Sequence, residues 1–344
     1  MRNFNFASME KPKSIQEDKE VFVHASDLEL GYRSGAATQR VASHVSFALC
    51  RKELTCLMGP NGVGKSTLLK AIMHQHPPLK GEVWLGDSLA SRLSEKERAK
   101  RVAVVLTEKV PTGLLTVRDL VALGRTPHTG WWGQLSPVDQ AKIEEVMELT
   151  GIAYLANKNI SALSDGQRQT ALIARALAQD SPIMVLDEPT AHLDLSNRFE
   201  IMYLLRDLAR KASKAILVVT HDLEVALETA DKLWLMDTAQ PLLTGSPEDL
   251  MISGGIQRLL PGEKWRVDAA SGKIVRHTAP IPCKIEGPES LVSWVKNALR
   301  KNPGLRLPDK IYLSEAPFTI KITFLQNDYQ FSSISDMIGF LQGP

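Results

Sequence analysis

The sequence predicts an α/β protein built on a parallel β-sheet with helices on both faces, followed by a small α+β appendage. Short, fully apolar runs such as Ile183–Leu186 and Ala215–Thr220 alternate with segments of helical periodicity such as Ser196–Ala212. Continuous apolar strands are typical of a sheet buried on both faces, and strands that alternate with helices favour parallel pairing. After about Gly262 the composition changes and proline separates short segments, which indicates a second, smaller unit.

Apolar periodicity predicts the individual elements. In the larger part these are a strand at Val21–Leu30, two short strands within Val45–Leu57, a helix opened by Gly59–Ser66 and ending near Met73, strands at Gly81–Leu85 and Val102–Leu106, and helices at Val117–Leu123, Pro137–Thr150 and Asp165–Gln179, followed by the strand, helix and strand named above. In the appendage they are strands at Ala279–Gly287, Pro317–Leu325 and Asp328–Phe331 and helices at Ser290–Arg300 and Ser335–Leu341, a β-α-β-β-α pattern.

Composition argues against several functional classes. The 344 residues carry 41 basic and 39 acidic side chains, so the net charge of +2 predicts no nucleic-acid partner. No run approaches the about 20 apolar residues that a membrane-spanning helix needs. The polar residues 1–20 lack the apolar region of a secretory signal. Cys50, Cys56 and Cys283 include no C-x-x-C pair, which fits a reducing, cytoplasmic compartment better than a disulfide framework or a zinc site.

A glycine-rich run follows the apolar segment Leu54–Met58 and precedes a helix. It matches G-x-x-x-x-G-K-[ST] and consists of Gly59, Pro60, Asn61, Gly62, Val63, Gly64, Lys65, Ser66 and Thr67. Its glycines let the backbone bend so that N–H groups face inward and, with the helix N-terminus, form an anion cradle. Lys65 supplies a charge for the β- and γ-phosphates of a nucleotide, and Ser66 offers a hydroxyl to Mg²⁺.

Two carboxylates and a histidine come at the ends of neighbouring apolar strands. Asp187 and Glu188 end the run from Ile183, and His221 follows the run that ends at Thr220. Open parallel sheets bind ligands at the carboxyl ends of their strands. We therefore expect Asp187 to hold Mg²⁺, Glu188 to act as general base toward water, and His221 to sense the γ-phosphate.

Ser164 begins the helix predicted from Asp165. With Gln167 three residues later it forms a capping-box pattern, which is a purely structural reading. The same capped N-terminus, with Gly166 exposed, is also an anion site. Because this segment lies about a hundred residues from the phosphate loop, we expect a second subunit to contribute it to the nucleotide site.

These motifs occur together in the order seen in one large family. The phosphate loop, Leu163–Gln169, Leu186–Thr190, Leu193-Asp194 and His221 make the sequence resemble ATP-binding-cassette ATPases over about residues 21–262. The resemblance implies a P-loop NTPase fold with a RecA-like parallel sheet core, an N-terminal antiparallel β subdomain and a helical signature subdomain at about residues 114–178. The polar tail, residues 1–20, and the α+β appendage, residues 263–344, lie outside it.

The resemblance also implies how the nucleotide is held. Two chains would form a head-to-tail homodimer that sandwiches two ATP molecules, each contacting the phosphate loop of one chain and Ser164, Gly166 and Gln167 of the other. Tyr32 matches the aromatic residue that stacks on adenine, the alternative being an ordinary surface tyrosine. Asp194 belongs to the loop that crosses between the two sites.

A segment of the helical subdomain narrows the resemblance. Leu115–His128 looks like subunits of importers for iron–siderophores, haem and cobalamin. In that group the region lies where the coupling helix of a membrane permease docks, and an external substrate-binding protein delivers the cargo. The expected location is the cytoplasmic face of the inner or plasma membrane. Trp131 and Trp132 follow directly and suit either a protein contact or burial within the subdomain.

Two positions depart from the family pattern. Thr107 stands where glutamine usually contacts Mg²⁺ and the attacking water, with Glu108 beside it. Thr107 can hydrogen-bond but is shorter, so we expect it near the metal with an altered contact. Asp165 stands where glycine is usual; it suits a helix N-terminus but would repel a γ-phosphate, so we expect it to point to solvent.

The leading hypothesis is therefore the ATPase subunit of a membrane importer. One alternative is a soluble cassette ATPase that works on a macromolecule, but such proteins often carry two cassettes or a long coiled coil, and this sequence has one phosphate loop and no heptad run. The other is a regulatory module that binds ATP without turnover, which Glu188 and His221 oppose and which Thr107 and Asp165 keep open.

Overall fold

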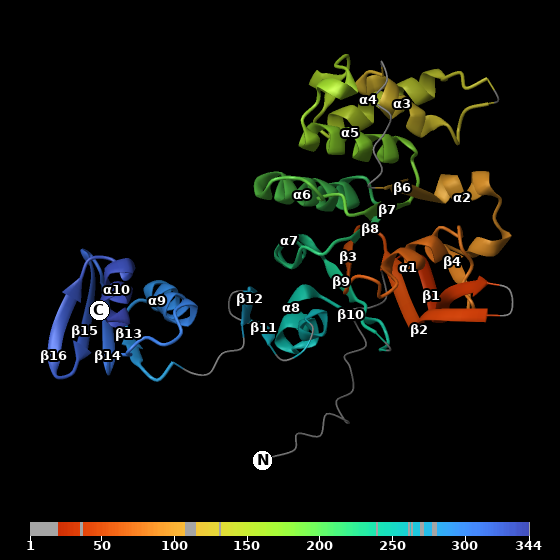
Figure 1. The fold of residues 1–344 in the computed structure, drawn as a ribbon. Coiled ribbons are helices and arrows are strands. Elements are labelled where there is room, and N and C mark those ends of the chain that lie inside the picture. Colours follow the sequence, from red (N-terminus) through yellow and green to blue (C-terminus); the bar gives the residue numbers. More distant parts are fainter. Residues whose placement is uncertain are drawn as a thin grey trace. The chain divides into compact units, whose positions relative to one another are not determined.

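The computed structural model describes residues 20–34, 37–106, 115–130, 132–238, 240–260, 262, 264–268, 272–276 and 281–343. The chain divides into two compact units, Met1–Pro261 with Val267–Ile274, and Gly262–Arg266 with Val275–Pro344. Each unit has its own β-sheet and helices (Figure 1). Among the described residues, no helix is both long and apolar enough to cross a membrane.

The centre of the first unit is a six-stranded sheet in the order β10-β9-β3-β8-β7-β6. Its strands are β3 (Leu54–Met58), β6 (Val102–Val105), β7 (Ile183–Asp187), β8 (Ala215–Val219), β9 (Lys232–Leu235) and β10 (Leu243–Gly245). All neighbours pair in parallel except β10, which joins β9 antiparallel at the edge. The predicted parallel sheet is thus confirmed, and β9 and β10 extend it beyond the strands that apolar periodicity predicted.

The sheet is buried on both faces because successive side chains enter two different cores. Met184 and Leu186 of β7 belong to a core shared with the helices of the first unit, whereas Ile183 and Val185 belong to a second core. An antiparallel sheet in the order β2-β1-β4-β5 supplies much of that second core, together with the first helix of the chain. The continuous apolar runs in the sequence follow from this double burial.

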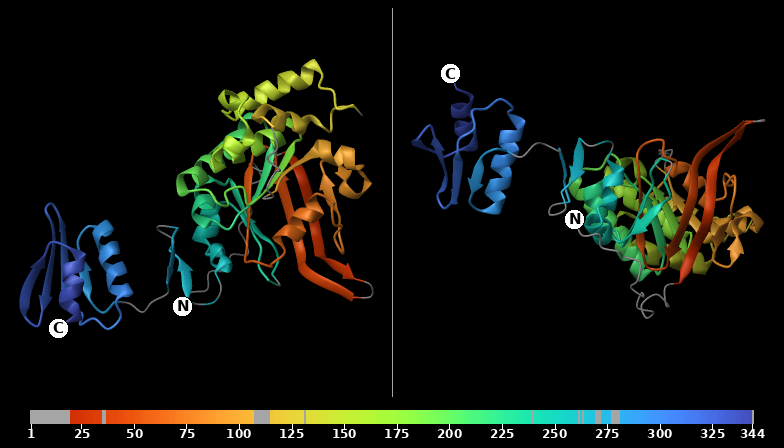
Figure 2. Two further views of the ribbon diagram at one scale, coloured as in Figure 1. Left: turned by 45° about the horizontal axis from the view of Figure 1, so that its top comes forward. Right: turned by 90° about the horizontal axis from the view of Figure 1, so that it is seen from below.

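The antiparallel sheet consists of β1 (Val21–Ser34), β2 (Ala37–Cys50), β4 (Val83–Leu85) and β5 (Ser88–Leu89). Figure 2 shows the long ribbon that β1 and β2 form. Both strands are longer than the apolar pattern predicted. The first half of β2 alternates poorly because Gln39, Arg40 and His44 are exposed there, so only its pairing with β1 identifies it as a strand.

Eight α-helices lie in the described part of the first unit. They are α1 (Lys65–Ile72), α2 (Glu95–Arg101), α3 (Val117–Ala122), α4 (Pro137–Leu149), α5 (Asp165–Ala178), α6 (Leu195–Lys211), α7 (Leu223–Thr229) and α8 (Pro247–Ile252). Short 3₁₀ helices occur at Ala90–Arg92, Leu123–Arg125, Ala153–Leu155, Ile160–Ala162 and Gly255–Leu259. Helices α3, α4 and α5 pack on one another and form a helical group (Figure 1).

The helix predictions are confirmed for α1, α3, α4, α5 and α6 to within a few residues. Capping boxes fix three of these ends: Thr116 begins α3, Ser136 begins α4 and Ser164 begins α5. Helix α2 was not predicted because no residue of it is buried, so it has no apolar stripe to detect.

The second unit is a four-stranded sheet in the order β13-β14-β15-β16 with two helices. Its elements are β13 (Lys284–Glu286), α9 (Glu289–Lys301), β14 (Lys310–Glu315), β15 (Phe318–Phe324), β16 (Asn327–Phe331) and α10 (Ile334–Gln342). A separate core joins Val295 of α9 and Met337 of α10 to Ile311, Leu313 and Ile320 of the sheet. The strands β11 (Trp265–Val267) and β12 (Ile274–Arg276) form a two-stranded sheet.

The predicted β-α-β-β-α pattern of the appendage was incomplete. Strand β14 adds a member between α9 and β15 and pairs in parallel with β13 and antiparallel with β15. Its buried residues, Ile311 and Leu313, alternate as in a half-buried strand, but Tyr312 between them is exposed and hides that alternation in the sequence.

Candidate functional site

The phosphate loop connects β3, at the centre of the parallel sheet, to α1. Gly62 and Gly64 have φ angles of 80° and 113°, a region that side chains strongly disfavour. At Gly59 a Cβ atom would lie 2.4 Å from the carbonyl oxygen of Met236 on the neighbouring strand end. Glycine is therefore required by conformation at two positions and by space at the third, and the loop can present its N–H groups to an anion.

Lys65 begins α1 with its side chain folded back over the loop. Its Nζ donates hydrogen bonds to the carbonyl oxygens of Gly59 at 2.7 Å and Pro60 at 3.0 Å. Burial lowers the pKa of the Lys65 ammonium, and the carboxylates of Glu188 and Asp187 oppose that change. The loop thus holds a buried cation that faces two acidic groups.

Asp187 and Glu188 lie where β7 ends, beside the end of β8. Burial raises the pKa of Asp187, the neighbouring Glu188 raises it further, and Lys65 opposes the shift. Glu188 adopts a φ of 48°, which is uncommon for a residue with a side chain, and its N–H donates to the carbonyl oxygen of Val219 at 2.9 Å. This backbone bond ties the acidic pair to the adjacent strand.

His221 follows β8 on the same edge. Its Nδ1 lies 3.2 Å from Oε1 of Glu188, and its side chain is 67% exposed. The structure therefore brings together the ends of β3, β7 and β8, as expected for the carboxyl edge of a parallel sheet. His221 contacts Glu188 but does not line the cavity described next.

A cavity of about 430 Å³ opens over this edge. Its lining consists of Tyr32, Gln39, Val41, Asn61, Gly62, Gly64, Lys65, Ser66, Thr67, Asp187, Glu188 and Val219. The other loop residues Gly59, Pro60 and Val63 do not line it. Gln39 and Val41 were not predicted; the signal was available only through strand pairing, since Gln39 lies opposite Tyr32 in the β1–β2 ladder.

Tyr32 lies at the β1 side of the cavity. Its hydroxyl is 3.0 Å from Oγ1 of Thr67, the last residue of the phosphate loop. The tyrosine is partly buried and is joined directly to the loop. It is therefore part of the cavity wall rather than an ordinary surface tyrosine.

The residues predicted at the start of α5 lie away from the cavity of their own chain. The Ser164 hydroxyl accepts from the N–H of Gln167, and the Gln167 side chain accepts from the N–H of Ser164. Gly166 faces Asn197, since an added Cβ would lie 3.1 Å from its Oδ1. Asp194 caps α6 by accepting from the N–H of Asn197 at 2.9 Å.

Asp165 faces solvent, as expected: its side chain is 69% exposed and pairs with Arg168 at 3.2 Å. Trp132 is 86% exposed, which excludes burial in this chain. Thr107, with Glu108, and Trp131 lie outside the described residues.

The cavity suits a polyphosphate with an associated cation. The glycine cradle and Lys65 provide donors, while the Ser66 hydroxyl and the Asp187 carboxylate provide hard oxygen ligands. Among the described residues, no group of three or more His, Cys, Asp or Glu side chains could hold a metal ion alone. Two protein oxygens that share a cation with phosphate oxygens are what Mg²⁺ requires at such sites.

Comparison with known proteins agrees with this geometry. The family described as ABC transporter matches residues 42–191. The chain is 43% identical over 211 residues to an uncharacterised ABC transporter ATP-binding protein of Methanocaldococcus jannaschii, covering 61% of this chain and 73% of that protein. It is 35% identical over 237 residues to the ferric enterobactin transport ATP-binding protein of Escherichia coli, covering 69% and 86%. The dimeric structure of a bacterial ABC transporter cassette matches with a TM-score of 0.55 and 27% identity, covering 65% of this chain and 98% of that one.

Proposed function

Because the chain belongs to the ATP-binding-cassette transporter ATPases, we propose that it powers a membrane importer for an iron–siderophore complex or a related compound such as haem or cobalamin. The chain binds ATP and is an ATP hydrolase of this family. The observation that carries the proposal is the cavity, in which the phosphate loop, Asp187 and Glu188 converge on one side. The relative that serves ferric enterobactin transport supports the proposed cargo.

The chain's own residues divide the chemistry among them. The loop amides and Lys65 bind the β- and γ-phosphates and neutralise charge that develops on them during transfer. Glu188 orients the attacking water and accepts its proton as general base, and His221 holds Glu188 and contacts the γ-phosphate. Ser66 and Asp187 would hold Mg²⁺, which supplies electrostatic stabilisation of the phosphate oxygens. Tyr32 stacks on the adenine.

A second copy of the chain completes the site in this proposal. Ser164, Gly166 and Gln167 do not line the cavity of their own chain, yet they form a capped helix N-terminus that can bind an anion. In a head-to-tail homodimer each copy places this N-terminus on the γ-phosphate of its partner, and Asp194 lies in the loop between the two sites. Exposed Asp165 stays clear of the nucleotide.

The helical group would contact the permease. Trp132 and Val138, at the loop before α4 and on α4 itself, are 86% and 73% exposed, and exposed apolar side chains of this kind suit a protein partner. Docking there places the chain on the cytoplasmic face of the membrane, with the permease linking it to a substrate-binding protein. Closure of the homodimer on ATP and its opening after hydrolysis would then drive transport.

The test is ATP hydrolysis by the purified protein and by Glu188→Gln, with oligomeric state followed by size. Loss of a general base lowers turnover by roughly 10²-fold to 10⁴-fold, so we expect the variant to accumulate as an ATP-bound dimer. Glu224→Gln, an exposed carboxylate at the start of α7, is the matched control and keeps wild-type turnover. Equal turnover in wild type and Glu188→Gln would contradict the assignment of the base.

A further inference from the structure

We propose that His76 is a positioning residue that fixes Tyr32 as the platform for the nucleotide base. The inference rests on the proposed function, because it concerns the cavity that binds ATP. His76 follows α1 and does not line the cavity itself, so it acts through Tyr32. The predicted consequence is that His76 determines how tightly the base, rather than the phosphates, is bound.

Two contacts join His76 to the segment that carries Tyr32. The imidazole and phenol rings have centroids 4.8 Å apart and planes tilted by 35°. The Nε2 of His76 lies 3.0 Å from the carbonyl oxygen of Gly31. Because that oxygen can only accept, Nε2 carries the proton and donates it. His76 thus contacts the Tyr32 ring and holds the backbone immediately before it.

The backbone at Gly31 has no freedom to move away. A Cβ atom there would lie 2.2 Å from the carbonyl oxygen of Gln39 on β2 and 2.7 Å from the Leu79 side chain. The two strands are therefore pressed together at the point where His76 attaches. Gln39 also lines the cavity, so the same close approach positions the part of the wall beside Tyr32.

The phenol hydroxyl supplies the third attachment, to Thr67 at 3.0 Å. Thr67 lies in the first turn of α1, and the N–H of His76 donates to the carbonyl oxygen of Lys70 in the same helix at 3.2 Å. Both anchors of the Tyr32 ring therefore belong to α1 or to the residues directly after it. One rigid helix therefore sets the distance between the phosphate cradle and the base platform. Both parts of the site are preorganised before the nucleotide binds.

Calorimetric titration of the full chain with ATP and, separately, with inorganic tripolyphosphate tests the proposal. Tripolyphosphate uses the cradle and Lys65 but has no base. We expect His76→Ala to weaken ATP binding by roughly threefold to tenfold, the range of an aromatic contact, and to leave tripolyphosphate binding within about twofold of wild type. His76→Phe keeps a ring against Tyr32 and restores most of the ATP affinity.

A second histidine, on the strand β1 that carries Tyr32, provides the matched control. His24 stacks on Trp84 with ring centroids 5.9 Å apart, away from the cavity lining. His24→Ala loses a similar ring contact and is expected to bind both ligands as wild type does. It separates a general loss of strand packing from a specific effect on the base platform.

Four results overturn the proposal or its premise. Unchanged ATP affinity in both His76 variants contradicts the role of His76 while leaving the proposed function intact. Equal weakening of ATP and tripolyphosphate in both variants shows that His76 serves only the fold of the loop. If wild-type protein binds ATP no more tightly than tripolyphosphate, the role of Tyr32 as a platform for the base is contradicted. If wild-type protein binds neither ligand, the proposed function itself is contradicted.

Discussion

Two of the places where the first unit holds charged side chains out of solvent differ in how the charges are partnered. In the helical group, Arg125 and Asp139 form an ion pair with side chains only 7% and 8% exposed. Beyond the carboxyl ends of the central strands β3 and β7, Lys65, Asp187 and Glu188 line a cavity and form no such ion pair with one another. The charges of the helical pair are satisfied within the chain, whereas the charges around the cavity remain available to a ligand.

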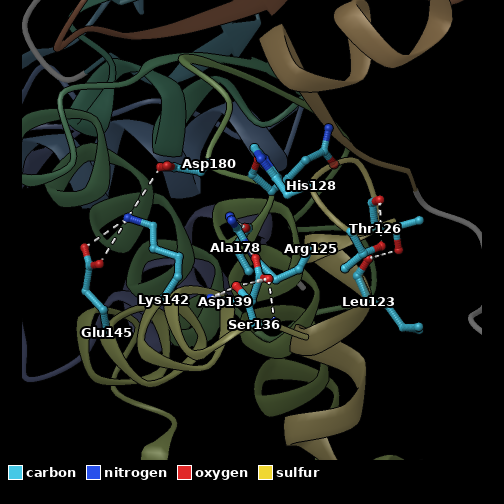
Figure 3. A network of polar contacts seen from close by, with 12 residues as sticks. Leu123, Arg125, Thr126, His128, Ser136, Asp139, Lys142, Glu145, Ala178 and Asp180 are labelled. Atoms are coloured by element: carbon cyan, nitrogen blue, oxygen red, sulfur yellow. Dashed lines mark hydrogen bonds and ion pairs between the residues drawn. The ribbon is translucent and has the colours of Figure 1, made fainter. Parts of the chain in front are cut away.

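The helical pair has hydrogen-bond partners on both sides (Figure 3). Arg125 donates from Nε to Asp139 and from Nη1 to the carbonyl oxygen of Ala178, both at 2.8 Å. Asp139 also accepts from the hydroxyl and the N–H of Ser136, at 2.6 Å and 2.9 Å. The hydrogen bonds from Ser136 and then Arg125 lower the pKa of Asp139 to about 2, so its charged form is the stable one.

Two of the cavity groups, Lys65 and Asp187, have pKa values displaced toward their neutral forms. Burial lowers the pKa of Lys65 and raises that of Asp187. A site that disfavours its own charges gains free energy when a ligand supplies the missing partners. The comparison therefore predicts that the helical pair serves stability and that the cavity charges serve binding.

The largest effect on stability is expected from breaking the helical pair. Asp139→Asn leaves Arg125 buried without its counter-ion, which costs about 3 kcal/mol of unfolding free energy. Chemical denaturation measures it. Asp207→Asn is the control, since Asp207 pairs with Lys211 on the exposed face of α6 and is expected to cost less than about 0.5 kcal/mol. Similar losses in the two variants would remove the distinction between buried and exposed pairs.

Lowering the pH is expected to reduce the unfolding free energy by a smaller amount. The folded pKa of Asp139, about 2, lies below the ordinary value of 3.8, so its stabilisation is complete above about pH 4. It is lost as the pH falls from about 4 to about 2, because the unfolded chain takes up the proton first. Denaturation midpoints against pH should therefore fall less steeply in this interval for Asp139→Asn than for wild type. Parallel curves would show that Asp139 does not carry this pH dependence.

The sequence predicted the cavity better than the helical pair, and the reason is chemical. Lys65, Ser66 and Asp187 lie in short local motifs at the ends of apolar strands, and parallel topology alone places those ends on one edge. Arg125 and Asp139 are ordinary charged residues in sequence, 14 positions apart, and only the packing of the helices brings them together.

Long-range pairing also explains the cavity residues that escaped prediction. Gln39 and Val41 line the cavity because β2 pairs with β1, and His76 contacts Tyr32 only because the chain returns past β1 after α1. No local pattern marks these positions. Strand β14 was missed for a related reason, since its register with β13 and β15 identifies it and its composition does not.

The most direct test of the contrast is the unfolding free energy of Lys65→Ala with and without Mg²⁺ and ATP. Without nucleotide we expect it to stay within about 1 kcal/mol of wild type, because the buried ammonium is lost together with its desolvation cost. Saturating nucleotide at about 100 times its dissociation constant should stabilise wild type by about 2.7 kcal/mol and Lys65→Ala hardly at all. Asp139→Asn should start lower and gain the full increment. A large loss in nucleotide-free Lys65→Ala, or an undiminished gain with nucleotide, would contradict the account.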